Sequence, residues 1–124
     1  MRNEKEILKD KETTSYLIGR LIKECENSRG YIGVEYDNLV PNIQEGETYT
    51  ELLFHKILNE MVVLTGPLDS EYLDNEYNDE PAPFKSERNV RQHVVRLGKF
   101  VLKYAPKYLP AESAESFIQQ VHKM

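Results

Sequence analysis

The residues best suited to chemistry gather in one short stretch, SERNVRQHVVRLGKF at residues 86–100. It contains four of the sixteen basic residues of the chain and one of its three histidines. An arginine fork fits phosphate or carboxylate oxygens, and a histidine exchanges protons near neutral pH. The stretch therefore indicates an acidic protein partner, a nucleic acid partner or a catalytic pair.

Within this stretch, Arg88-Asn89 followed by three residues and His93 resembles the R-N-x-x-x-H motif of HEPN domains, small all-α ribonucleases and their relatives. Arg96-Leu97 extends the likeness. The resemblance implies metal-independent RNA cleavage at a dimer interface. In such a site Arg88 would hold the scissile phosphate, His93 would transfer protons, and Asn89 would orient them.

Helix geometry bears on these catalytic roles. At about 100° per residue, Arg88 lies about 140° around the helix axis from His93. Asn89, His93 and Arg96 are closer neighbours, at positions i, i+4 and i+7. His93 also borders the apolar stripe of the helix, so we expect a partly buried histidine that donates to a neighbouring group. Binding and catalysis are the alternative roles.

A second candidate site has the opposite charge and follows the sequence DSEYLDNEYNDE at residues 69–80. Tyrosines supply contact area at low entropic cost, and carboxylates steer a basic partner and select it. A solvated acidic surface is the alternative. The residues expected to bind are Asp69, Glu71, Tyr72, Asp74, Glu76 and Tyr77.

Basic residues of the helix after Ser86 form a third candidate surface, which suits phosphates or an acidic protein. They are Arg88, Arg91, Arg96, Lys99, Lys103 and Lys107. In addition, SYLIGRL at 15–21 and LPAESAESF at 109–117 resemble the helical small-subunit tails of CRISPR surveillance complexes. That likeness implies a nucleic-acid-contacting subunit of a larger assembly.

Other chemistry has no pattern to support it. His55, His93 and His122 lack the paired spacing of a metal site, so no metal is expected. Cys25 lies on the apolar side of its helix, which predicts a core thiol. No glycine-rich loop joins a strand to a helix, and no cofactor is expected.

Length and composition set the broad class. The 124 residues predict a single helical domain over residues 1–124, with 40% hydrophobic and 30% charged residues. No apolar run approaches the roughly 18 to 20 residues of a membrane helix, and the start does not resemble a secretory signal. With Cys25 as the single cysteine, we expect a cytoplasmic protein that does not enter a membrane.

Charge is distributed unevenly along the chain. Residues 1–84 carry 8 basic and 18 acidic residues, a net charge of −10, whereas residues 85–124 carry 8 and 3, a net charge of +5. Such asymmetry either steers a partner or lets two halves of one fold neutralise each other.

Capping signals mark the starts of two helices in the first half of the chain. Asn3 with Glu6 begins a helix that runs to about residue 27, and Thr48 with Glu51 begins the clearest helix of the chain. The polar KDKETTS at 9–15 is expected to break the first of these helices in two. Apolar residues cover more than one face of the second, which predicts a central position.

Prolines and a serine delimit the remaining elements. Pro67 opens a short acidic helix that continues through about residue 77. Ser86 caps a helix over 87–104, which Pro106 is expected to end, and a final helix follows Pro110.

We therefore expect an all-α, compact bundle of four to five helices, centred on 48–64 and 87–104. An irregular connection is expected at about 29–46 and a Pro-rich loop at about 78–85. The expected function is that of a non-enzymatic protein-interaction module, an accessory, inhibitor or immunity-type subunit that binds through the acidic segment or the basic helix face. A HEPN-like ribonuclease and a nucleic-acid-contacting subunit are the alternatives, and a homodimer stays open.

Overall fold

The computed structural model describes residues 3–26, 48–67 and 86–124, and these ranges contain four helices. They are α1 (Glu4–Cys25), α3 (Tyr49–Thr65), α4 (Glu87–Tyr108) and α5 (Ala111–His122), and the described ranges contain no strand. The expected all-α bundle is confirmed. The expected helix at 68–77, the connection at 29–46 and the loop at 78–85 lie outside the described residues. None of the four helices is long and apolar enough to cross a membrane.

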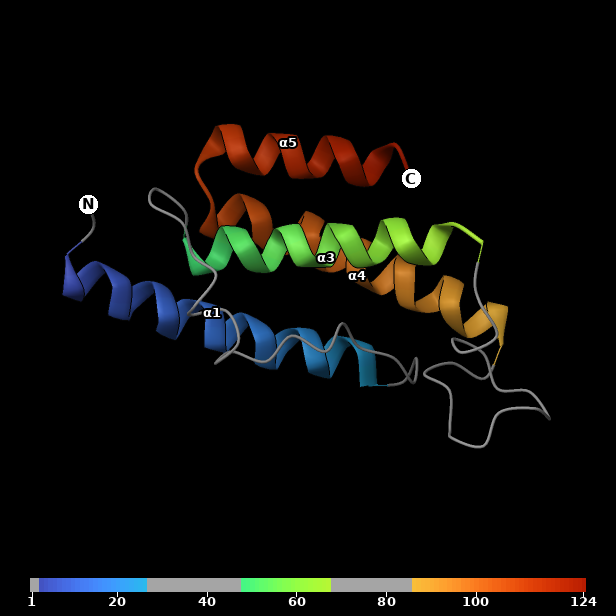
Figure 1. The fold of residues 1–124 in the computed structure, drawn as a ribbon, viewed down its shortest axis with the longest axis horizontal. Helices are drawn as coiled ribbons and strands as arrows, with labels where there is room; N and C mark the ends of the chain where they lie inside the picture. The colour runs from blue at the N-terminus through green and yellow to red at the C-terminus, as the bar shows by residue number, and fades with distance from the viewer. Residues whose placement is uncertain (1–2, 27–47, 68–85) are drawn as a thin grey trace.

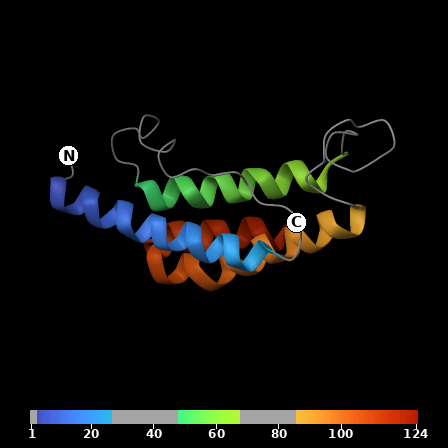
Figure 2. The same cartoon turned by 90° about the horizontal axis from the view of Figure 1, so that it is seen from below.

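Helices α3 and α4 pack against each other at the centre of the bundle, as expected. Helices α1 and α5 lie on opposite sides of this pair, and all four are drawn out along one long axis (Figure 1, Figure 2). The short link at Leu109 and Pro110 turns the chain back, so that α5 returns antiparallel along α4.

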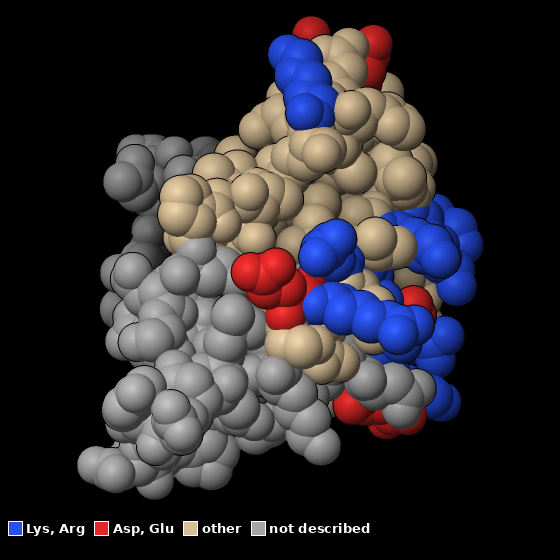
Figure 3. Space-filling view, turned by 90° about the vertical axis from the view of Figure 1, so that its right-hand side faces the viewer, with Lys and Arg blue, Asp and Glu red and all other residues tan. Residues whose placement is uncertain are grey.

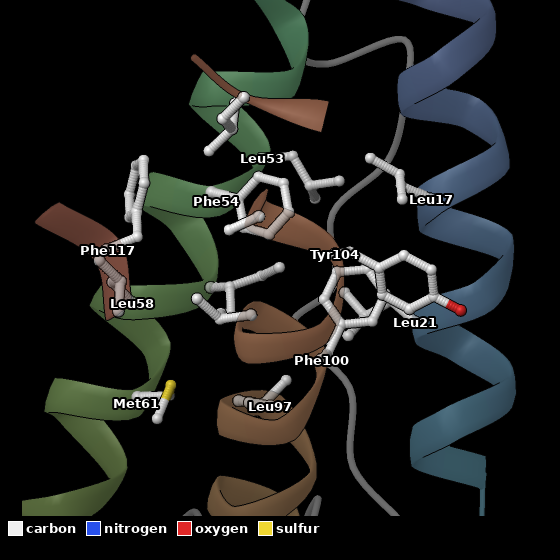
Figure 4. Close-up of a cluster of buried hydrophobic side chains, with 14 of the residues drawn as sticks. Leu17, Leu21, Leu53, Phe54, Leu58, Met61, Leu97, Phe100, Tyr104 and Phe117 are labelled. Atoms are coloured by element: carbon white, nitrogen blue, oxygen red, sulfur yellow. The ribbon is translucent and has the colours of Figure 1, made fainter. Parts of the chain in front are cut away.

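The core is aliphatic and aromatic, and every helix contributes to it (Figure 4). Leu17 and Leu21 of α1 point toward α3 and α4. The ring of Phe54 on α3 lies 6.0 Å from that of Phe100 on α4 and 5.8 Å from that of Phe117 on α5, measured between centroids. These ring pairs join three helices through one side chain, and each adds a modest amount to the burial of apolar area.

Gly98 is a position where α4 lies close to two neighbouring helices. A Cβ atom added there would lie 3.3 Å from Cε of Met61 on α3 and 3.4 Å from Cγ1 of Val121 on α5. Glycine therefore lets α4 approach both neighbours without displacing their side chains.

Helix α1 is continuous, so the break expected within residues 9–15 is wrong. The polar side chains of that stretch make contacts outside their own turn: the carboxylate of Asp10 accepts hydrogen bonds from the backbone N–H groups of Tyr49 (2.5 Å) and Thr50 (3.2 Å). The hydroxyl oxygen of Thr14 lies 3.0 Å from that of Thr50 on α3, within hydrogen-bond distance. These residues thus satisfy the first turn of α3 instead of interrupting α1.

The expected caps at the starts of α1 and α3 are confirmed. The Asn3 side chain accepts a hydrogen bond from the N–H of Glu6 at 2.9 Å, and the Thr48 hydroxyl accepts one from the N–H of Glu51 at 3.0 Å. Both bonds satisfy donors that have no partner within the helix.

Helix α4 extends beyond the expected end, because Pro106 lies inside its last turn and the helix continues to Tyr108. Proline lacks an N–H group, so it removes the bond that would reach the carbonyl of Leu102. The bond that closes the last turn is retained, since the N–H of Leu109 donates to the carbonyl of Ala105 at 3.0 Å. One missing bond near the end of a long, packed helix does not terminate it.

Candidate anion-binding site on helix α4

The inner and outer faces of α4 differ in polarity. Its inner face is buried against α1, α3 and α5, and consists of Val90, His93, Leu97, Phe100, Val101 and Tyr104. Val94 is only half-buried, whereas the adjacent His93 is fully buried. The long cationic side chains lie on the opposite face, because the chain places them about half a turn away from these core residues.

A groove of about 520 Å³ follows this outer face, and we call it the cationic groove. The described residues that line it are Arg88, Arg91, Gln92, Val95, Arg96 and Lys99. Its four cations stand at positions i, i+3, i+8 and i+11, which spans about 17 Å along a helix. Figure 3 looks onto the end of the bundle where α4 begins and shows Lys and Arg atoms gathered on one flank.

Helix α4 itself places little negative charge beside these cations. Glu87 is the single carboxylate of α4, and its Oε2 lies 3.8 Å from Nη2 of Arg91. The two side chains are 74% and 79% exposed, and such a solvated pair contributes little to stability. This pair therefore reduces the electropositive field of the groove only slightly.

Arg96 marks the inner edge of the cationic groove. Its Nη1 atom is buried and has no hydrogen-bond partner among the residues that the structure describes. A buried donor that lacks an acceptor carries a desolvation cost.

The charge of Arg96 also reaches the core. Burial, together with the nearby Arg96 guanidinium, lowers the pKa of His93 to about 4. The imidazole is therefore neutral at pH 7. Burial likewise raises the pKa of the Cys25 thiol to about 11, so this core residue is not a thiolate at neutral pH.

Three residues carry the HEPN resemblance, and they lie in different surroundings. Arg88 is exposed in the cationic groove, whereas His93 is fully buried on the inner face. Asn89 belongs to the helix cap: its N–H donates to the Ser86 hydroxyl at 3.3 Å, and that hydroxyl donates to Oδ1 of Asn89 at 2.9 Å. Within one chain the three side chains do not converge on one point, and the ribonuclease assignment stays a prediction.

Two further cations extend the outer face beyond the groove. Lys103 and Lys107 are exposed, and Nζ of Lys103 lies 5.2 Å from the centroid of the Tyr104 ring.

The Tyr104 hydroxyl also contacts α1, because Nε of Arg20 donates a hydrogen bond to it at 3.3 Å. This bond lowers the pKa of the Tyr104 phenol.

A second groove, of about 600 Å³, lies at the same end of the bundle, and sequence reasoning missed it. We call it the apolar groove. Its described lining is Leu64, Thr65, Gly66, Pro67, Glu87, Val90, Arg91, Val94, Val95 and Met124. No local signal could have revealed it, because its walls come from the end of α3, the start of α4 and the end of the chain.

The remaining expected sites receive no structural support. The acidic segment, with Asp69, Glu71, Tyr72, Asp74, Glu76 and Tyr77, lies outside the described residues. Within the described ranges, no group of three or more His, Cys, Asp or Glu side chains could hold a metal ion. Comparison of the chain with protein families, with characterised proteins and with solved structures finds no match.

Proposed function

We propose that this protein is a non-catalytic binding module that holds an acidic segment of a partner protein in the cationic groove of α4. One observation carries the proposal: four cations share a single groove in which no described lining residue is a carboxylate. Clefts lined by one sign of charge focus the field and attract the opposite charge. Three of the four cations are arginines, whose planar forks bind carboxylates in a bidentate manner.

The composition of the groove supports binding over catalysis. Its described lining offers arginine, lysine, glutamine and valine, none of which exchanges protons readily near neutral pH. The histidine nearest in sequence, His93, is fully buried on the other side of the helix.

One observation supports a protein partner over a nucleic acid. Val95 is 54% exposed between the cations of the groove, and an aliphatic side chain there adds nothing to a phosphate contact. Nucleic acid is the second candidate, because arginine forks also fit phosphate oxygens.

Fluorescence anisotropy with two labelled probes tests this proposal. The probes are a polyglutamate peptide and a single-stranded RNA of the same number of charges, at low and near-physiological salt. The test variant combines Arg88→Gln, Arg91→Gln, Arg96→Gln and Lys99→Gln. We expect it to weaken peptide binding about tenfold, since four exposed ion pairs together contribute on the order of 1 to 2 kcal/mol.

A matched control removes the same charge elsewhere. Lys5→Gln, Lys9→Gln, Lys23→Gln and Lys123→Gln change four exposed lysines on α1 and at the end of the chain. Equal weakening by the control would show that net charge, and not the groove, attracts the peptide. Tighter binding of RNA than of peptide would favour the second candidate, and metal-independent RNA cleavage that His93→Gln abolishes would establish the ribonuclease.

A further inference from the structure

The cationic groove and the apolar groove form one continuous surface. Arg91 and Val95 line both of them, so the two grooves meet along the outer edge of α4. A ligand that occupies the cations of the first half of α4 therefore lies beside an apolar wall.

The apolar groove is open and has adaptable walls. Val95 and Met124 are 54% and 45% exposed, and Val94 behind them is half-buried. Its floor at the end of α3 includes Leu64 and Pro67. An unbranched methionine fits apolar side chains of different shapes, and covering these walls would remove apolar area from water.

Charge and shape together specify the occupant. Arg91, Arg96 and Lys99 lie about 4.5, 12 and 16.5 Å from Arg88 along the helix axis, because each residue of an α-helix adds about 1.5 Å. A partner helix aligned with α4 repeats its side chains with the same rise, so carboxylates at similar intervals would meet these cations. A nucleic acid has no aliphatic side chain for the apolar groove.

We infer that the partner segment is an acidic amphipathic helix, whose carboxylates face the cationic groove and whose large aliphatic side chains enter the apolar groove. This inference rests on the proposed function and adds the chemistry of the partner. Helices that lay an apolar face into a groove are recognised through anchors at i, i+3, i+4 and i+7.

Two synthetic helical peptides test the inference. Both carry the same glutamates on one face; the first has leucines on the adjacent face, and the second has glutamines there. We expect the leucine peptide to bind about tenfold more tightly, because each leucine that enters the groove leaves water. This preference should persist at high salt, whereas the affinity of both peptides should fall.

Variants of exposed residues assign the preference to the apolar groove. Met124→Asn should remove most of the advantage of the leucine peptide and leave the glutamine peptide unchanged, because Met124 lines the apolar groove and is not among the described lining residues of the cationic groove. The matched control is Leu8→Asn, since Leu8 on α1 is 57% exposed and lines none of the grooves described above. Circular dichroism should show the same helicity for all variants.

The outcomes separate the inference from the proposed function. Equal affinity for the two peptides, lost in the four-cation variant, would overturn the inference and leave the proposed function intact. If the four-cation variant binds either peptide as tightly as the unchanged protein does, both the inference and the proposed function are overturned. A dimer detected by sedimentation and lost in Val95→Asn would mean that a second copy of the chain covers the groove, and the inference would again be overturned.

Discussion

The inner and outer faces of α4 share one backbone, yet two basic residues less than one turn apart behave in opposite ways. His93 on the inner face is fully buried, and burial lowers its pKa until the ring is neutral. Arg96 sits at the edge of the outer face and contributes to a groove with three other cations. Location on the helix therefore helps to decide which basic residue is available to a partner.

This difference also separates stability from binding. The inner face consists of side chains that pack against three helices, so it determines whether the protein folds. The outer face has long, solvated side chains whose removal leaves the core intact. Substitutions on the two faces should therefore affect different measurements, and the predictions below follow from that expectation.

The largest effect is expected from a pair of aliphatic truncations. Leu97→Ala removes a fully buried side chain and should lower the free energy of unfolding by about 3 to 4 kcal/mol, through lost burial and a residual cavity. Val95→Ala, on the outer face, should change it by less than about 0.5 kcal/mol. Urea unfolding measures both, and similar losses would contradict the assignment of the two faces.

The next effect is a pH dependence that comes from His93. Its pKa is about 4 in the folded protein and about 6.5 in the unfolded chain, so between these values only the unfolded chain binds the proton. The contribution of neutral His93 to the free energy of unfolding is complete above pH 6.5. It should fall by about 2 to 3 kcal/mol as the pH drops to 4. Urea midpoints over this range measure it.

Two variants isolate the contribution of His93 from that of the carboxyl groups. His93→Gln should flatten the slope of stability between pH 6.5 and 4, whatever its cost at neutral pH. His122→Gln changes an exposed histidine and should leave that slope unchanged. An unaltered slope in His93→Gln would show that the imidazole is accessible to protons in the folded protein.

A smaller effect of opposite sign is expected from the outer face. The variant with glutamine at positions 88, 91, 96 and 99 relieves repulsion between like charges and should raise the free energy of unfolding by about 0.5 kcal/mol. The gain should disappear at high salt. A large loss of stability would show that these cations are paired within the fold, and would weaken the case for a binding site.

The smallest effect concerns Glu87, the carboxylate at the start of α4. Glu87→Gln removes its exposed ion pair with Arg91 and its favourable position near the helix N-terminus. We expect a loss of about 0.3 kcal/mol in unfolding free energy and a slight increase in affinity for the polyglutamate peptide. Weaker peptide binding in this variant would contradict an electropositive role for the groove.

The elements that depend on local spacing were predictable from the sequence. The caps at Asn3, Thr48 and Ser86 require a side chain and an N–H group three residues apart, and all three form as expected. The two wrong boundaries arose where tertiary contacts override local preference. Asp10 and Thr14 engage α3, and the packed last turn of α4 tolerates Pro106.

The candidate site was predictable only in part, for the same reason. The cations of α4 could be identified because their charge and helical spacing are local properties of the sequence. The apolar groove could not, since Leu64, Val94 and Met124 come together only in the folded chain. The complete burial of His93 is also a tertiary property, and the sequence placed it only at the border of the stripe.

Asp10 of α1 caps the start of α3, so the first amides of α3 report whether α1 is in place. First-turn amides of a helix ordinarily exchange their hydrogens with water quickly, because they lack partners inside the helix. Here the amides of Tyr49 and Thr50 donate to a carboxylate that belongs to α1. Their deuterium uptake should therefore occur only in the moments when α1 detaches, so two protons at the start of α3 measure how often the amino-terminal helix leaves the bundle.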